Sequence, residues 1–118
     1  MCYLTDSGNT GYLGHDGTNL VVLSSPSGEK GKWILSQLYG SKYMIHTASG
    51  ELLFLSHADG KVSLRYASTR EEKWEALMGG DFINAIRTPE GLFLDIAAPG
   101  FLSEEGNLKT NVWKIVRV

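Results

Sequence analysis

Apolar and polar residues alternate over short stretches of the chain. The clearest example is the set Val62, Leu64 and Tyr66, which alternates with polar residues. This period of two is typical of a β-strand with one buried face. Pairs such as Asp59-Gly60 separate the apolar stretches and tolerate the positive φ angles of a tight hairpin turn. No apolar stripe of helical spacing lasts three turns, so the pattern predicts an all-β domain.

Four landmarks recur in the same order three times along the chain, which indicates an internal repeat. They are a Thr-x-x-Gly element, an aromatic-leucine pair, an apolar residue seven positions after that leucine, and a tryptophan. In chain order they are Thr5/Gly8, Tyr12-Leu13, Leu20 and Trp33; Thr47/Gly50, Phe54-Leu55, Val62 and Trp74; Thr88/Gly91, Phe93-Leu94, Phe101 and Trp113. The tryptophans, the only three in the chain, follow the leucines by 20, 19 and 19 residues. The three copies therefore span approximately 1–41, 42–80 and 81–118.

Each copy has room for about four strands at the usual spacing, which gives about twelve strands in all. The turn pairs Asp16-Gly17, Asp59-Gly60 and Pro99-Gly100 mark the middle hairpin of each copy. Three copies are too few for a β-propeller, which usually needs at least four blades.

Strand number, threefold repetition and length resemble the β-trefoil fold over the whole chain. That resemblance implies a six-stranded barrel built from the first and last strands of each copy and capped at one end by the middle hairpins. A closed barrel also removes the exposed strand edges that an isolated copy would have. Each tryptophan removes on the order of 150–250 Å² from water when it is buried, so we expect all three in the core.

Length and composition bound the remaining possibilities. A chain of 118 residues is one domain, and its net charge of −2, with basic and acidic residues interleaved, disfavours nucleic acids and anionic membranes as partners. Cys2 is the only cysteine, which excludes an internal disulfide and fits a reducing compartment. The first residues lack a secretory signal, and no stretch has the roughly 18 apolar residues of a membrane span. We expect a monomeric cytoplasmic protein without membrane insertion.

Two trefoil families share features with this chain. Residues 50–56 (GELLFLS) followed by 60–64 (GKVSL) resemble the repeat of fascin and hisactophilin, which are actin-binding trefoil proteins. One tryptophan per copy is similar to the ricin-B-like lectins, but the Gln-x-Trp motif of those lectins is absent, and only Asp95 matches their sugar-binding aspartate. The interval from that aspartate to the tryptophan is also shorter than in ricin-like repeats. Spacing favours the first family, and the tryptophans favour the second.

The charge distribution helps to choose between the two ligands. An actin filament is acidic, so a protein that binds it benefits from a basic surface. The charged residues before the three tryptophans sum to about zero, and the chain has only three histidines, whereas hisactophilin is defined by many. A neutral ligand therefore suits this surface better.

The leading hypothesis is a lectin-like module that binds neutral glycans at the turns of the cap hairpins. Sugar hydroxyls pair with Asp, Asn and His side chains, and the candidate residues are His15, Asp16, Asn19, His57, Asp59 and Asp95. Two of them, His15 and His57, occupy the same position of their copies; a solvated turn is the simpler interpretation of both. The aspartates at 16 and 59 are better explained as turn formers than as ligands.

Two alternatives stay open at this point. A fascin-like domain would bind actin or another protein through basic residues: Lys30, Lys32, Arg70, Lys73 and Lys109. A trefoil of the protease-inhibitor or cytokine type would instead present a single loop to its partner.

No catalytic or metal-binding signature is present. The three histidines lack the short spacings of metal sites, and Cys2 has no local nucleophile motif. The glycines and lysines of 28–32 lack the spacing of a phosphate-binding loop. We predict a binding module that is not an enzyme and needs no cofactor or metal.

Overall fold

The computed structural model describes residues 1–8, 10–16, 19–26, 28–48, 53–66, 73–104 and 112–117. Its strands are β1 (Cys2–Asp6), β2 (Tyr12–His15), β3 (Leu20–Leu23), β4 (Trp33–Tyr39), β5 (Lys42–Thr47), β6 (Phe54–Ala58), β7 (Lys61–Arg65), β8 (Trp74–Gly79), β9 (Phe82–Arg87), β10 (Phe93–Leu94), β11 (Leu102–Ser103) and β12 (Trp113–Arg117). Within these ranges the one helical element is a 3₁₀ turn, η1 (Glu29–Gly31). The predicted all-β fold is confirmed.

Six of the strands close into a barrel. Going round the ring, β1 pairs with β4, β4 with β5, β5 with β8, β8 with β9, β9 with β12, and β12 with β1 again, and every pair is antiparallel. The β1–β12 ladder runs from Cys2 opposite Arg117 to Asp6 opposite Trp113, so it joins the two ends of the chain. Each barrel strand therefore has a partner on both sides.

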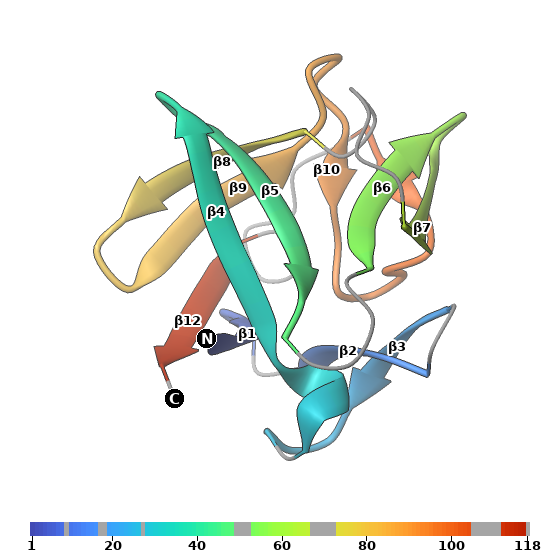
Figure 1. Ribbon diagram of the computed structural model, residues 1–118, viewed down its shortest axis with the longest axis vertical. Coiled ribbons are helices and arrows are strands. Elements are labelled where there is room, and N and C mark those ends of the chain that lie inside the picture. The colour runs from blue at the N-terminus through green and yellow to red at the C-terminus, as the bar shows by residue number, and fades with distance from the viewer. Residues whose placement is uncertain are drawn as a thin grey trace.

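Three hairpins lie outside this ring: β2–β3, β6–β7 and β10–β11. Each follows a barrel strand, to which its first strand is paired. Figure 1 shows the barrel hairpins β4–β5 and β8–β9 on the left with both chain ends, and the cap hairpins β2–β3 and β6–β7 on the right. A six-stranded barrel with three cap hairpins is the β-trefoil fold, as the sequence predicted.

The three tryptophans occupy the centre of the core, as predicted. Trp33, Trp74 and Trp113 have no exposed surface. The indole N–H of Trp33 donates to Leu13 O, and that of Trp74 donates to Leu55 O, each at 2.9 Å. In the first two copies the tryptophan is thus bonded to the leucine landmark of its own copy, which fits their nearly equal separation of 20 and 19 residues.

The repeated threonines shape the turns between the first and second strands of the copies. All three are buried. Thr5 Oγ1 donates to Gly11 O at 2.7 Å, whereas Thr47 Oγ1 and Thr88 Oγ1 accept from backbone N–H groups at 3.1 and 3.2 Å. A buried hydroxyl that satisfies the backbone of a turn accounts for this landmark without any role in chemistry.

The turns of the cap hairpins differ in length. Asp59 (φ 52°) and Gly60 (φ 75°) form a two-residue turn between Ala58 and Lys61, as their sequence predicts. In the first cap hairpin the pairing of His15 with Leu20 leaves a loop of four residues, which begins at Asp16. Gly17 lies outside the described residues. The third hairpin has a longer connection, which contains Pro99 and Gly100.

Candidate functional site

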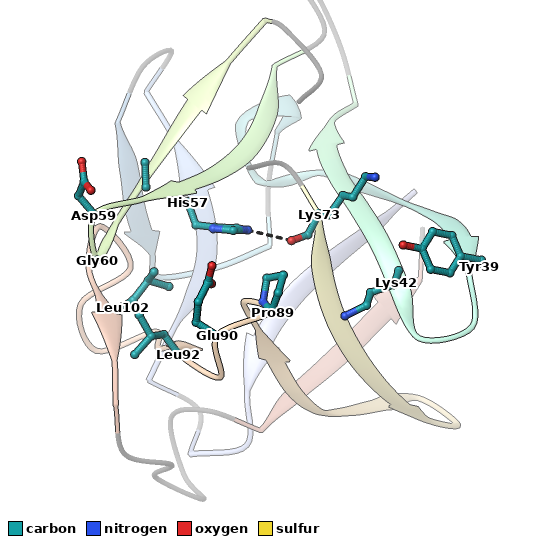
Figure 2. A pocket seen from close by; sticks show the side chains of 11 residues that line it. Tyr39, Lys42, His57, Asp59, Gly60, Lys73, Pro89, Glu90, Leu92 and Leu102 are labelled. Atoms are coloured by element: carbon teal, nitrogen blue, oxygen red, sulfur yellow. Dashed lines mark hydrogen bonds between the residues drawn. The ribbon is translucent and has the colours of Figure 1, made fainter. Parts of the chain in front are cut away.

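A cleft of about 750 Å³ lies between the β6–β7 hairpin and the turn that follows β9 (Figure 2). This volume is within the usual range for small-molecule sites, about 300–1,000 Å³. Its polar and aromatic lining residues are Tyr39, Lys42, His57, Asp59, Lys73 and Glu90. Its apolar side chains are those of Pro89, Leu92 and Leu102 together with Ala58. The cleft brings charged, aromatic and apolar side chains together, which makes it a candidate site.

His57 forms the inner wall of the cleft. It is 8% exposed, and its Nε2–H donates to the carbonyl oxygen of Lys73 at 2.9 Å (Figure 2). The imidazole also packs edge-on against Trp74, with 4.9 Å between the ring centroids. Because the ring is fixed on two sides, His57 holds the backbone before β8 against the cap hairpin. The imidazole shapes the cleft and leaves little surface for a ligand.

Asp59 lies at the outer edge of the cleft, on the β6–β7 turn. This turn is tied to the β10–β11 connection, because Val62 N donates to Gly100 O at 3.0 Å and Leu102 N donates to Gly60 O at 2.8 Å. The positive φ angles and these two bonds fix the position of the Asp59 backbone. Its side chain is exposed, so a carboxylate is presented to solvent from a rigid support.

Glu90 comes from the turn between β9 and β10, which the third Thr-x-x-Gly element forms. Gly91 N donates to Thr88 O at 2.9 Å, and Gly91 has a φ of 91°, which favours glycine. Figure 2 shows the Glu90 side chain directed into the middle of the cleft, towards His57. A second carboxylate is thereby placed inside the cleft.

Lys42 and Tyr39 form the other end of the cleft, at the β4–β5 hairpin. Lys42 Nζ lies 3.0 Å from Glu75 Oε2, while Arg87 Nε donates to Glu75 Oε1 at 2.8 Å. Hydrogen bonds from Arg87 and Lys42 hold the pKa of Glu75 below its ordinary value. Tyr39 is 62% exposed, so this end offers an ammonium group and an exposed aromatic residue.

The six residues predicted as ligands do not converge on one place. His57 and Asp59 line the cleft, but the other four lie elsewhere. Their role in ligand binding stays a prediction.

In the first copy, His15 packs edge-on against Trp33 at 5.6 Å, and burial lowers the pKa of its imidazole. Asp16 Oδ1 accepts from Asn19 N at 2.9 Å within the turn. In the third copy, Asp95 Oδ1 likewise accepts from Ala97 N at 2.9 Å. Both aspartate carboxylates therefore stabilise their own turns by accepting a backbone hydrogen bond.

Sequence analysis missed Tyr39, Lys42 and Glu90 as lining residues. Tyr39 and Lys42 flank the turn between the first and second copies, and Glu90 lies on the Thr-x-x-Gly turn of the third copy, whereas the residues predicted as ligands lie on the cap hairpins. The Thr-x-x-Gly landmark was the available signal for Glu90, because it marks a turn that adjoins the preceding cap hairpin. Lys42 and Tyr39 carry no comparable signal.

Other candidate sites have less support from the structure. Within the described ranges no three His, Cys, Asp or Glu side chains gather as metal ligands. Cys2 is buried in β1, and burial raises the pKa of its thiol. Nothing in those ranges forms a helix with the length and hydrophobicity that crossing a bilayer requires.

Of the basic residues suggested for actin binding, Arg70 and Lys109 lie outside the described residues. Lys32 Nζ is bonded to Glu29 Oε1 at 3.1 Å, Lys30 is exposed in η1, and Lys73 lines the cleft. Binding of actin or another protein stays a prediction.

The fold is similar to solved structures over almost the whole chain. One is the designed threefold symmetric protein ThreeFoil, with 20% sequence identity, a TM-score of 0.73, and 99% of this chain and 98% of that chain covered. Another is SeviL bound to the asialo-GM1 saccharide, with 13% identity, a TM-score of 0.78, and coverage of 99% and 96%. No protein-family model matches the sequence, and no curated protein matches it either. At these identities the similarity concerns the fold alone.

Proposed function

We propose that this β-trefoil is a non-catalytic, lectin-like module that binds carbohydrate in the cleft between the β6–β7 hairpin and the turn after β9. The observation that carries the proposal is the cleft itself, which combines fixed polar side chains with apolar and aromatic surface. The fold it shares with SeviL, which was solved bound to a saccharide, supports the choice of ligand class.

The side chains of the cleft suit the hydroxyl groups of a sugar. The carboxylates of Asp59 and Glu90 accept hydrogen bonds, and the ammonium groups of Lys42 and Lys73 donate them. The leucine and proline side chains, with Tyr39, cover the apolar face of a ring. A hydroxyl is both donor and acceptor, so a cleft with both kinds of partner fits a carbohydrate.

The arrangement argues for binding rather than hydrolysis. Glycoside hydrolases place two carboxyl groups on either side of the bond that they cleave. Here Glu90 points into the cleft, while Asp59 lies at its outer edge (Figure 2). Of the two carboxylates, only that of Glu90 is therefore directed into the middle of the cleft.

A glycan array tests the proposal. We expect wild-type protein to bind a set of oligosaccharides and Glu90→Gln to bind them roughly tenfold more weakly, because a charge-assisted hydrogen bond is lost. Asp59→Asn should weaken binding less, since its carboxylate lies at the edge, and asparagine tolerates the positive φ of the turn.

Matched controls separate binding from charge and folding. Glu104→Gln makes the same charge change on an exposed residue outside the cleft, and Asp81→Asn does so on the β8–β9 turn. Both controls should keep the wild-type array profile. Equal loss in Glu104→Gln and Glu90→Gln, or an array without any bound glycan, would remove the assignment.

A further inference from the structure

Charge is unevenly distributed along the cleft. Lys42 and Lys73 lie at the end near Tyr39 and the β4–β5 hairpin, while Asp59 lies at the opposite end and Glu90 in between (Figure 2). The formal charges of these four side chains cancel, but their separation gives the cleft a basic end and an acidic end. A ligand with a single kind of polar group along its length would match only one of the two.

The basic end keeps a positive charge after its internal ion pairs are counted. Glu75 is the carboxylate that binds both Lys42 and Arg87 there, at 3.0 Å from Lys42 Nζ and 2.8 Å from Arg87 Nε. The group of Lys42, Arg87 and Glu75 therefore has a net charge of +1. The carboxylate of Glu75 also holds the Lys42 side chain in place, so the ammonium group needs little further ordering to meet an anion.

We propose that the bound glycan carries an acidic sugar, a sialic or uronic acid, whose carboxylate is received at the Lys42 end of the cleft, while a neutral sugar of the same chain occupies the part near Glu90. This inference rests on the proposed carbohydrate-binding function and specifies its ligand class. Both sources offer the same carboxylate, so the binding chemistry is shared.

The sequence favoured a neutral ligand because the loops before the tryptophans sum to about zero charge. The structure shows where the charges lie, which their sum does not. Lys42 begins β5, outside those loops, yet the closure of the barrel brings it to the cleft. Lys73 precedes β8 and lines the same cleft, whereas its neighbour Glu75 is already bonded to Lys42 and Arg87.

Matched pairs of oligosaccharides test this inference. One series compares lactose with sialyllactose, and a second compares glucose disaccharides with disaccharides that end in glucuronic acid. Wild-type protein should bind the acidic member of at least one series about tenfold more tightly than its neutral partner, as expected of one charge-assisted contact. Whichever series shows the preference identifies the kind of acid.

Two substitutions should move this preference in opposite directions. Lys42→Gln removes the ammonium group and should reduce the acidic-to-neutral affinity ratio to about one. Glu75→Gln removes the competing carboxylate and should raise the ratio above that of wild type. A purely structural role of the ion pair would lower binding of both glycans in both variants. Lys42→Arg keeps the positive charge and should keep the preference for the acidic glycan. It therefore serves as the control that distinguishes loss of charge from a folding defect in Lys42→Gln.

Lys61→Gln provides a control of equal charge, because Lys61 is exposed on β7 and does not line the cleft. Its affinity ratio should equal that of wild type, and added salt should weaken only the binding of acidic glycans. Equal binding of acidic and neutral glycans by wild-type protein would overturn this inference and leave the proposed function standing. Absence of all glycan binding would overturn both.

Discussion

His15, His57 and Ile96 occupy one position of the three copies, two residues after the leucine landmark. Each histidine packs edge-on against the tryptophan of its own copy, and Ile96 is fully buried. Two copies place an imidazole at this position and the third places an aliphatic side chain. The position therefore requires a side chain of suitable shape rather than a particular chemical group. The two histidines that the sequence analysis named as candidate sugar ligands thus contribute to the packing around the tryptophans.

This packing gives His15 a measurable effect on stability. Burial lowers the pKa of His15 below its ordinary value of 6.5, so the unfolded chain binds the proton more readily than the folded one. The free energy of unfolding is then greatest above pH 6.5 and decreases as the pH falls towards the folded-state pKa. His15→Ile, which copies the third repeat, should flatten this dependence. Urea denaturation at several pH values between 7.5 and 5 measures it; parallel curves for the two proteins would contradict the prediction.

The tryptophan N–H groups allow a comparison within one molecule. Trp33 donates to Leu13 O, whereas Trp113 Nε1 is buried and has no hydrogen-bond acceptor among the described residues. Trp33→Phe and Trp113→Phe lose similar apolar volume, but only the first breaks a buried hydrogen bond. Trp33→Phe should therefore destabilise the protein by about 1–3 kcal/mol more than Trp113→Phe. Denaturant unfolding followed by circular dichroism gives both values, and equal losses would refute this account.

At the scale of elements, the tight turn of the β6–β7 hairpin has a clear conformational requirement. Gly60 has a φ of 75°, and a Cβ added there would contact nothing within 4 Å. Gly60→Ala should therefore cost about 1–2 kcal/mol through backbone strain alone. Gly100→Ala is the matched control, because Gly100 also has open space but no positive φ. Thermal unfolding should show a lower Tm for the first variant only; a similar decrease in both would point to packing instead.

Sequence predicted these elements because their signals are local. Asp59-Gly60 tolerates the positive φ angles of a two-residue turn, and a period of two identifies a strand without its partner. The same reasoning was less informative at Asp16, where the dipeptide begins a loop of four residues. The pairing of His15 with Leu20 decides that length, and strand register depends on contacts between segments that a single stretch of sequence does not contain.

The candidate site was less predictable for a related reason at the scale of the whole molecule. Its lining residues run from Tyr39 to Leu102 and come from five separate segments. Only the closed barrel brings them together. The internal repeat predicted the barrel and its three tryptophans, but copies that share landmarks differ at Lys42 and Glu90, and those differences make the cleft. Threefold repetition therefore explains the scaffold, and departure from it explains the site.

The barrel also predicts where new chain ends can be introduced by circular permutation. The β4–β5 and β8–β9 hairpins are equivalent to the junction of the two chain ends (Figure 1). The turn of each hairpin accepts a hydrogen bond from the next barrel strand: Ala76 N donates to Ser41 O at 2.9 Å, and Ile115 N donates to Asp81 O at 2.8 Å. At the chain ends, Cys2 lies opposite Arg117 in the ladder between β1 and β12. Joining the ends with a short glycine-serine linker and opening the chain between Gly80 and Asp81 should thus keep the fold.

We expect this circular permutant to unfold cooperatively, within about 1–2 kcal/mol of wild type, since one short loop replaces another. A second permutant, opened between Asp59 and Gly60, should keep the barrel but lose glycan binding, because the cut releases the turn that supports the outer edge of the cleft. Circular dichroism and the glycan array distinguish the two. If the first permutant fails to fold, the three junctions are not equivalent, because a barrel closed by equivalent hairpins does not depend on which of them is left open.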